Sequence, residues 1–460
     1  MKVTQNPRPD KPRQSPRGCN ARIKPRPSGR GLLITLCLAA SFAPAQNPPP
    51  AGGSITVSLA DALARARQYG NQIQSANLAL LQAKEDSVQA RANRLPSVNA
   101  LNQFIYTEGN GVSPSGVFIA NDGVHVYNEQ AIAHEEALAY FRRGETNRAL
   151  AGQAIAEAKI EIAKRGLDAT VIQAFFAIIA AQRKLANLQT SVAEAQRFTD
   201  ITQKQEQGGE VAHADVIIAQ IDLRQRQQNL QDAQLAIEKA KIGLGVLIFP
   251  NFSSDFTVVD DLNQVALLPP ATEAQAQAVS TSPDVRAATA GLQQAGHDIT
   301  IARYAYLPSL GLDVFYGINS NQFLFRTGDR QNLGYSAQAT LNIPVFNWGA
   351  TKSKIRQAEL KRDQAQQDLT LTQRTLQGNL AAAYAEARGA QAQIESLRGL
   401  VDLAAESLRL TLLQYQAGEA TALQVKDAQN TVTQARNSYD DGMVRYRLAL
   451  ASLQSLMGTL

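Results

Sequence analysis

The sequence predicts a mainly α-helical protein with four β-strands, in which one arrangement of elements occurs twice. Apolar and small residues recur at alternating steps of three and four over long stretches, which is the spacing of coiled-coil helices. Shorter stretches alternate between apolar and polar residues, as strands with two different faces do. Segments of the first half also recur in the second: EQGGEVAHADVIIAQ (206–220) and YQAGEATALQVKDAQ (415–429) share a Gly-Glu pair, a Val and an Ala-Gln pair.

The first 45 residues are interpreted as a secretory signal peptide. A basic, proline-rich region precedes the apolar run GLLITLCLAASF, and APA follows it, with cleavage expected after Ala45. A membrane-anchor helix is the competing interpretation, but the apolar run is shorter than the ~20 residues that a span needs. Both cysteines, Cys19 and Cys37, lie in this leader, and Leu36 before Cys37 does not suit a lipoprotein signal. We therefore expect no lipid anchor and no disulfide in the exported chain.

Most of the excess positive charge also belongs to the leader. Residues 1–45 hold nine basic residues and one acidic residue, so 36 basic and 39 acidic residues remain, and the pI near 9.1 does not indicate nucleic-acid binding. The four histidines are isolated, and the sequence has no zinc-protease helix, phosphate-binding loop or serine-hydrolase motif. We therefore expect neither an enzyme nor a cofactor or metal site.

The predicted organisation after the leader has four parts. A Pro/Gly-rich segment (46–57) precedes a first structural repeat (58–248), a linker (249–270) and a second repeat (271–460). Each repeat is predicted to contain, in this order, a helix, two strands, a very long helix, a glycine turn and a last helix. The helix over 349–415 would be ~100 Å long at ~1.5 Å per residue. Its partners before Pro308 and after Gly418 are little more than half as long, so two short helices could stack end to end beside one long one.

The strands of the second repeat have one apolar and one polar face. In GYSAQATLNIP (334–344), Tyr335, Ala337, Ala339, Leu341 and Ile343 share a face. Such ~10-residue strands suit the wall of a membrane barrel, and a small sheet covering a soluble core is the alternative. In the first repeat, EQAIAHEEALAY (129–140) carries charges where an apolar face should run, so its register is shifted or the strand is shorter. Four strands cannot close a barrel, so spanning a bilayer would require an oligomer.

The ordered set of these motifs resembles the outer membrane efflux family of TolC-like channels over nearly the whole exported chain. The marks of that family are LPS before a strand, PVFNWG opening a long helix, YxxG before a helix, and the terminal SLMGTL. The resemblance implies a homotrimer in which four strands per protomer complete a 12-stranded outer-membrane β-barrel. Long coiled-coil helices would continue it as an α-barrel tunnel in the periplasm. It also implies two partners, a periplasmic adaptor and an inner-membrane pump or secretion transporter, with passive conduction of substrate.

The resemblance further assigns the periplasmic tip. Gly208, Gly209 and Gly418 match the tip turns where adaptors dock. Tyr415 and Asp215 match positions of the closing contacts, and Asp427 matches an acidic constriction ring, which could favour cations in a narrow pore. Ala420 stands in place of a cation and Gln424 in place of a second acid. A tip held by packing and hydrogen bonds is therefore expected instead of a salt-bridge network.

Each of these residues also has a purely structural interpretation. Tyr415 falls on the heptad seam and could only pack there, Asp215 lies in a first helical turn where acids are stabilising, and Asp427 could lie on a solvated face. The rival function is a soluble periplasmic coiled-coil or adaptor-like protein. That protein would not need two strand pairs at matching places in both halves.

Overall fold

The computed structural model describes residues 55–106, 125–251, 255–264, 267–320, 325–327 and 330–460, all within one unit, Ser54–Leu460. The predicted signal peptide, both cysteines and most of segment 46–57 lie outside the described residues.

The described elements follow the same order twice. The first series is α1 (Leu59–Tyr69), α2 (Asn71–Ala92), β2 (Ser97–Tyr106), β3 (His125–Glu136), α3 (Gly144–Gln207) and α4 (His213–Ile248). The second is α5 (Ala271–Thr281), α6 (Pro283–Tyr304), β5 (Ser309–Ser320), β8 (Leu333–Asn342), α7 (Ala350–Gln416) and α8 (Ala422–Met457). Corresponding helices match in length: α1 and α5 have 11 residues, α2 and α6 have 22, and α4 and α8 have 36. Short elements complete the set: β1 (Ile55–Val57), a 3₁₀ turn (Ala139–Phe141), β4 (Phe256–Val258), β6 (Arg326–Thr327) and β7 (Arg330–Gln331).

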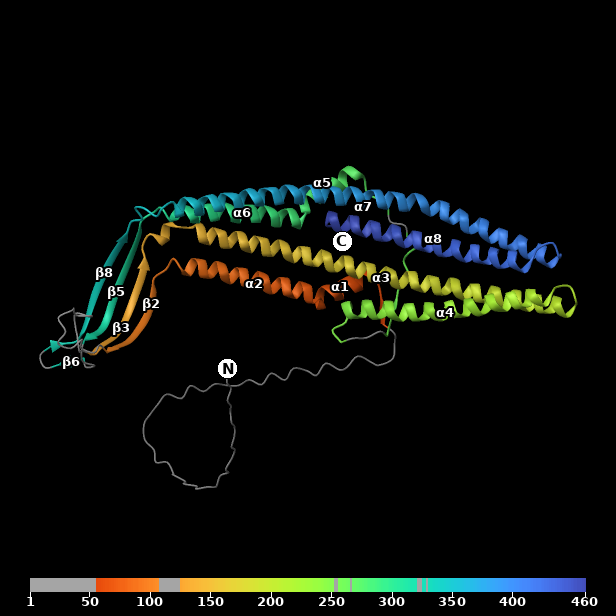
Figure 1. The fold of residues 1–460 in the computed structure, drawn as a ribbon, viewed down its shortest axis with the longest axis horizontal. Helices are drawn as coiled ribbons and strands as arrows, with labels where there is room; N and C mark the ends of the chain where they lie inside the picture. Colours follow the sequence, from red (N-terminus) through yellow and green to blue (C-terminus); the bar gives the residue numbers. More distant parts are fainter. Residues whose placement is uncertain (1–54, 107–124, 252–254, 265–266, 321–324, 328–329) are drawn as a thin grey trace, which may run out of the picture. The chain divides into compact units, whose positions relative to one another are not determined.

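The two long helices each carry two shorter ones, as their lengths predicted. Helices α2 and α4 pack along α3, and α6 and α8 pack along α7 (Figure 1). Helix α3 also contacts α6 and α8, which joins the two series. None of the helices in the described ranges combines the length and the hydropathy needed to cross a membrane.

The strands β2, β3, β5 and β8 form one antiparallel sheet in that order. Strand β3 spans His125–Glu136, so it begins four residues before the segment 129–140 and is not a shorter strand; of the two alternatives left open by the sequence, the shifted one agrees with the structure. In the observed register, His134 faces Asp313 across the β3–β5 pair, and its Nδ1 lies 2.6 Å from the Asp313 carboxylate. His134 and Glu136 therefore lie on the polar face of the sheet, whereas Glu135, opposite Leu312, lies on the other face.

The main hydrophobic core lies where α1, α3, α4 and α8 meet. The apolar run AFFAIIAA supplies Phe175, Phe176 and Ile179, which are all buried there. The predicted linker contributes as well, because β4 pairs in parallel with β1 and Phe256 is buried in the same core. The segment between the two series is thus part of the folded unit.

Arg183 of α3 fixes this linker to the helices. Its guanidinium donates to the Asp260 carboxylate at 2.7 and 3.1 Å and to Asp440 of α8 at 3.0 Å. Burial alone would raise the pKa of Asp260, but the hydrogen bond from Arg183, the Leu262 amide and the charge of Arg183 outweigh it and lower that pKa. A lowered carboxyl pKa means that ionised Asp260 stabilises the fold.

The two helix–helix turns share one geometry. At the first, Gly209 has φ +78° and its N–H donates to Glu206, while the Glu210 N–H donates to Gln205. At the second, Gly418 has φ +79°, with the N–H of Gly418 donating to Tyr415 and that of Glu419 to Gln414. Both are Schellman motifs, which require a left-handed residue at the position of these glycines. Gly208 has φ −79° and corresponds to Ala417, so it carries no such requirement.

We predict that Gly209→Ala and Gly418→Ala loosen their turns, because an L-residue in the left-handed region costs ~1 kcal/mol. Hydrogen exchange of the turn amides should accelerate about fivefold. Gly208→Ala is the matched control, since a Cβ there meets only ordinary contacts, beginning at 3.6 Å. Equal exchange in all three variants would contradict the assigned turn geometry.

We predict that Asp260→Asn lowers stability at neutral pH by ~1 kcal/mol, a figure discounted for the partial exposure of this ion pair. Because the pKa of Asp260 is lowered, its contribution is complete above the ordinary aspartate pKa and disappears as the pH falls through the lower, folded-state value. The apparent unfolding midpoints of the variant and the wild type should therefore differ at pH 7 and converge below about pH 4. Asp402→Asn, at an exposed position on α7, is the control and should leave the unfolding midpoint unchanged at both pH values.

Candidate functional site

The two turns pack against each other and form the candidate site. Between them lies a buried apolar cluster, which we name the tip cluster, at the end of the helices farthest from the sheet (Figure 1). It combines the end of α3, the start of α4, the end of α7 and the start of α8. Its members are Phe198, Ala219, Tyr415, Ala422 and Val425.

Tyr415 is the central side chain of the tip cluster, with 3% of its surface exposed. Its ring meets the Phe198 ring edge-on at 5.0 Å, and its hydroxyl donates to Thr202 Oγ1 at 3.3 Å. Burial raises the pKa of Tyr415; the hydrogen bond to Thr202 opposes this shift and the nearby Asp215 carboxylate adds to it. Tyr415 therefore stays a neutral hydrogen-bond donor at physiological pH.

The other predicted gate residues have different surroundings. Asp215 is half-buried in the first turn of α4, close enough to act on Tyr415. Gln424 is exposed and caps α8: its Oε1 accepts from the Thr421 N–H at 2.7 Å, and its own N–H donates to Thr421 Oγ1. Asp427 is exposed on α8. The structure thus brings Tyr415 and Asp215 together, while Gln424 completes a capping box.

An ion pair at the first turn was missed by the sequence analysis. His213 Nδ1 lies 2.6 Å from Glu206 Oε1, which links the first residue of α4 to the last turn of α3. The seven-residue separation across a glycine turn is the signal that could have indicated it.

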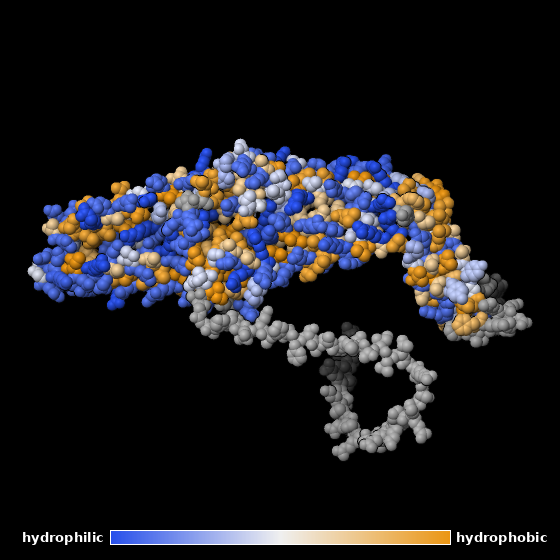
Figure 2. Space-filling view, turned by 180° about the vertical axis from the view of Figure 1, so that it is seen from behind, coloured by the Kyte–Doolittle hydropathy of each residue, from blue (hydrophilic) through white to orange (hydrophobic). Residues whose placement is uncertain are grey.

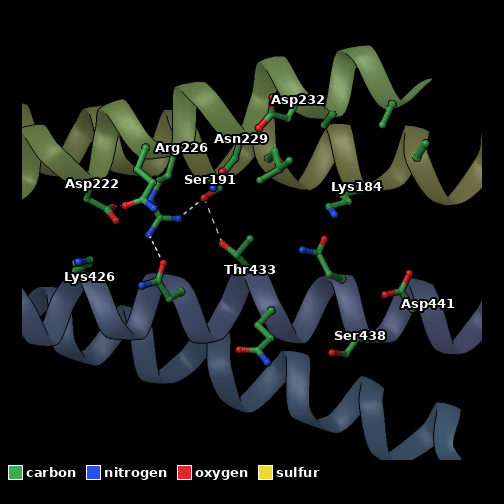
Figure 3. A pocket seen from close by; sticks show the side chains of 18 residues that line it. Lys184, Ser191, Asp222, Arg226, Asn229, Asp232, Lys426, Thr433, Ser438 and Asp441 are labelled. Atoms are coloured by element: carbon green, nitrogen blue, oxygen red, sulfur yellow. Dashed lines mark hydrogen bonds and ion pairs between the residues drawn. The ribbon is translucent and has the colours of Figure 1, made fainter. Parts of the chain in front are cut away.

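A buried arginine of α4 was missed as well. Arg226 is nearly fully buried, and its guanidinium donates to Asp222 at 2.6 Å and to Asn430 of α8 at 2.8 Å, with a further bond to Ser191 of α3 (Figure 3). Thr433 of α8 also donates to Ser191 Oγ at 3.3 Å. Arg226 lies seven residues before the buried Ala233, a heptad position where an apolar residue is expected, and that irregularity was its sequence signal.

Polar contacts continue along the α3–α8 interface. Asn187 donates to Asp440 at 2.9 Å, and Arg436 pairs with Glu194 at 3.3 Å. The α7–α8 pair contains an apolar cluster of Ala404, Leu408, Val432 and Ala435, together with an exposed ion pair between Arg445 and Glu386. Hydrogen bonds and hydrophobic packing thus occur both within and between the two hairpins: Arg226 bonds Ser191 inside the α3–α4 pair, and Met443 of α8 packs in the main core with α3 and α4.

An open groove of about 810 Å³ follows this polar interface between α4 and α8, with α3 as its floor (Figure 3). Amide, hydroxyl and charged groups of both signs line it, among them Lys184, Asn229, Asp232, Ser438 and Asp441. Within the described ranges, no cluster of three or more histidine, cysteine or acidic side chains could hold a metal ion. The groove suits water and polar contacts.

Comparison with known proteins supports one family. Residues 275–459 match the family model described as Outer membrane efflux protein. The chain is 26% identical over 330 residues to Outer membrane protein OprJ of Pseudomonas aeruginosa, covering 68% of this chain and 65% of OprJ. It is 27% identical over 308 residues to Pyoverdine export outer membrane protein OpmQ of Pseudomonas putida, covering 64% of this chain and 60% of OpmQ. The alignments thus span less than two thirds of these relatives' lengths.

The fold is shared with a solved outer membrane channel. The structure matches the CmeC outer membrane channel of Campylobacter jejuni with a TM-score of 0.76 at 17% identity, over 87% of this chain and 85% of that one. The predicted combination of long coiled-coil helices and a four-stranded sheet is confirmed, and so is the resemblance found in the sequence motifs. Residues 275–459 thus match the outer membrane efflux protein family, and the described fold is that of a solved outer membrane channel.

Proposed function

We propose that the protein is the outer-membrane channel of a tripartite efflux or type I secretion system. It would conduct substrates passively from an inner-membrane transporter through the periplasm and the outer membrane. The observation that carries this proposal is a sheet with a more apolar face, a more polar face and two edge strands that each have a neighbour on one side only. The helices next to these edge strands also expose apolar residues.

The faces of the sheet suit a barrel wall. The observed register places Val98, Ala133, Val314 and Ala337 in one row, and Ala100, Ala131, Tyr316 and Tyr335 in the next row of the same face. The opposite face is more polar: Ser, Asn, Gln and Thr predominate there with His134 and Asp313, beside a few apolar residues such as Phe315, whereas Glu129 and Glu135 lie on the more apolar face. The apolar face is exposed, and Tyr335 has 84% of its surface accessible. Lipid outside and water inside match this division.

The two open edges of the sheet are β2 and β8. Strand β2 follows α2, whose exposed apolar residues are Leu78, Leu81 and Val88, and α4 next to it along α3 exposes Ile217, Ile221, Leu235 and Ile242. Strand β8 leads into α7, which exposes Leu400, Leu403, Leu410 and Leu413. One side of the protomer is thus β2, α2 and α4, and the other is β8 and α7.

Two different sides can meet only head to tail, which closes into a ring. Three copies supply 12 strands, enough for a membrane barrel, whereas four strands are too few. A homotrimer is therefore the assembly that we propose, with the helices of the three copies forming the α-barrel tunnel.

The tip cluster suits the closing end of this tunnel. In our proposal Tyr415 and Asp215 hold the tip closed through packing and hydrogen bonds, and three copies of Asp427 form an acidic ring. The turns at Gly208, Gly209 and Gly418 would contact a periplasmic adaptor. Gln424 would contribute through its capping box, because its side chain is engaged with Thr421.

Substrate choice would lie with the inner-membrane pump. The name of one relative specifies pyoverdine, whereas the polar groove here presents charges of both signs without a shaped pocket. We also propose the organisation expected from the sequence: a signal peptide that ends at residue 45, a Pro/Gly-rich segment 46–57, a first repeat 58–248, a linker 249–270 and a second repeat 271–460.

We predict that the purified, signal-free protein inserts into a planar bilayer and gives small, cation-preferring conductance steps. Asp427→Ala should reduce the cation preference without preventing insertion, because a ring of carboxylates attracts cations in a narrow pore. Asp402→Ala, at another exposed acid, is the control.

Two other outcomes would change the account. Large and weakly selective steps would keep the channel and overturn the closed tip. Folded protein that stays soluble without detergent and never inserts would replace the channel with the adaptor-like alternative.

A further inference from the structure

The starts of α3 and α7 carry a group of exposed cations, which we name the basic collar: Arg143, Lys352, Lys354 and Arg356. Arg143 is the N-cap residue of α3, and the other three lie in the first two turns of α7. Strands β3 and β8 run in the same direction into these helices, so both starts lie at one end of the sheet. Nearby acids are few: Glu145 lies in the first turn of α3, and Glu359 contacts Arg356 at 3.3 Å.

These positions are electrostatically unfavourable for the helices themselves. A helix N-terminus carries partial positive charge, so cations there are repelled and anions attracted. The first turn of α7 holds no acid that could compensate, and in the described residues neither Lys352 nor Lys354 forms an ion pair. By contrast, Arg91 and Arg303 lie in the last turns of α2 and α6, where a cation is favourable. An anion from outside the helices would therefore stabilise the collar.

Exposed aromatic side chains lie directly beside the collar. Trp348 has 91% of its surface exposed and Phe346 has 72%, and their rings meet at 4.9 Å. Trp348 has φ +54°, which a bulky residue adopts at a cost, so the turn that exposes the indole is a constrained one. Figure 2 shows hydrophobic residues gathered where the sheet meets the helices. Tryptophan with neighbouring cations is typical of the boundary between lipid and water.

We propose that the basic collar binds the phosphate groups of anionic phospholipids at the helix end of the barrel, with Trp348 at the level of the headgroups. This inference rests on the proposed channel function, which puts the sheet in lipid. The helix N-termini add their partial charge to the four cations, as in other phosphate-binding sites. A second collar does not fit, because it would bring like charges together; the alternative occupant is α2 of the neighbouring copy, which exposes Glu85 and Asp86, and the test below distinguishes it from lipid.

The test uses Trp348, the one tryptophan of the chain, as a probe. The full-length exported protein is reconstituted in phosphatidylcholine vesicles that contain equal fractions of either brominated phosphatidylcholine or brominated phosphatidylglycerol. Bromine quenches tryptophan only at close range, so the ratio of quenching reports which lipid occupies the collar. We expect about fivefold preference for the anionic lipid, which 0.5 M NaCl should largely remove.

The triple variant Lys352→Gln, Lys354→Gln, Arg356→Gln should bring this preference close to one. Arg374→Gln with Arg388→Gln is the control, because both residues are exposed on α7 at least ~25 Å farther along the helix. In detergent the triple variant should be at least as heat-stable as the wild type, since it removes repulsion at the helix start. A loss of stability would assign the cations a role within the fold and overturn the proposal.

Conductance separates this proposal from the channel itself. If the wild type conducts but shows no preference for the anionic lipid, the collar proposal fails and the channel stands. If the wild type conducts and neither lipid quenches Trp348, a neighbouring protomer covers the collar, and the proposal fails in the same way. If the protein neither inserts nor conducts, the proposed function fails.

Discussion

The two edge strands impose the constraint on which the rest of the account depends. Within the described part of the chain, β2 and β8 each have a hydrogen-bonded neighbour on one side only. In lipid, unpaired backbone groups cost several kcal/mol each, so an open sheet with an apolar face is not stable there alone. The same two sides of the protomer expose apolar residues along α2, α4 and α7. Sheet and helices thus expose the same two sides of the protomer, which is the basis of the proposed trimer.

The helical part combines polar and apolar contacts. Apolar seams hold α7 to α8, whereas Arg226, Ser191 and Asn430 join α4, α3 and α8 through hydrogen bonds. Water can replace hydrogen bonds at little net cost, but it cannot replace hydrophobic packing. The tip cluster around Tyr415 adds one small apolar contact to that polar interface.

The sequence predicted the elements whose pattern is set locally. Heptad spacing gave α7 to within one residue of its observed limits, and Pro308 marked the start of β5. Strand β3 could not be placed from the sequence, because the polar residues in it have distant partners: His134 contacts Asp313, and Glu136 accepts a hydrogen bond from the Leu310 amide. Those partners lie some 175 residues away in the chain. The burial of Arg226 was missed for the same reason, since its acceptors lie on three helices. Long-range pairing, which no local pattern encodes, decided both cases.

The copy number in detergent tests the central claim most directly. Native mass spectrometry of the exported chain, released gently from detergent, should show three chains in one complex, with no stable monomer at the same detergent concentration. The substitution Ala337→Pro removes a backbone N–H from the edge strand β8. If that N–H pairs with β2 of the next copy, the substitution should convert the complex to monomers. A well-folded wild-type monomer would contradict the account, because the edges of β2 and β8 would then need no partner.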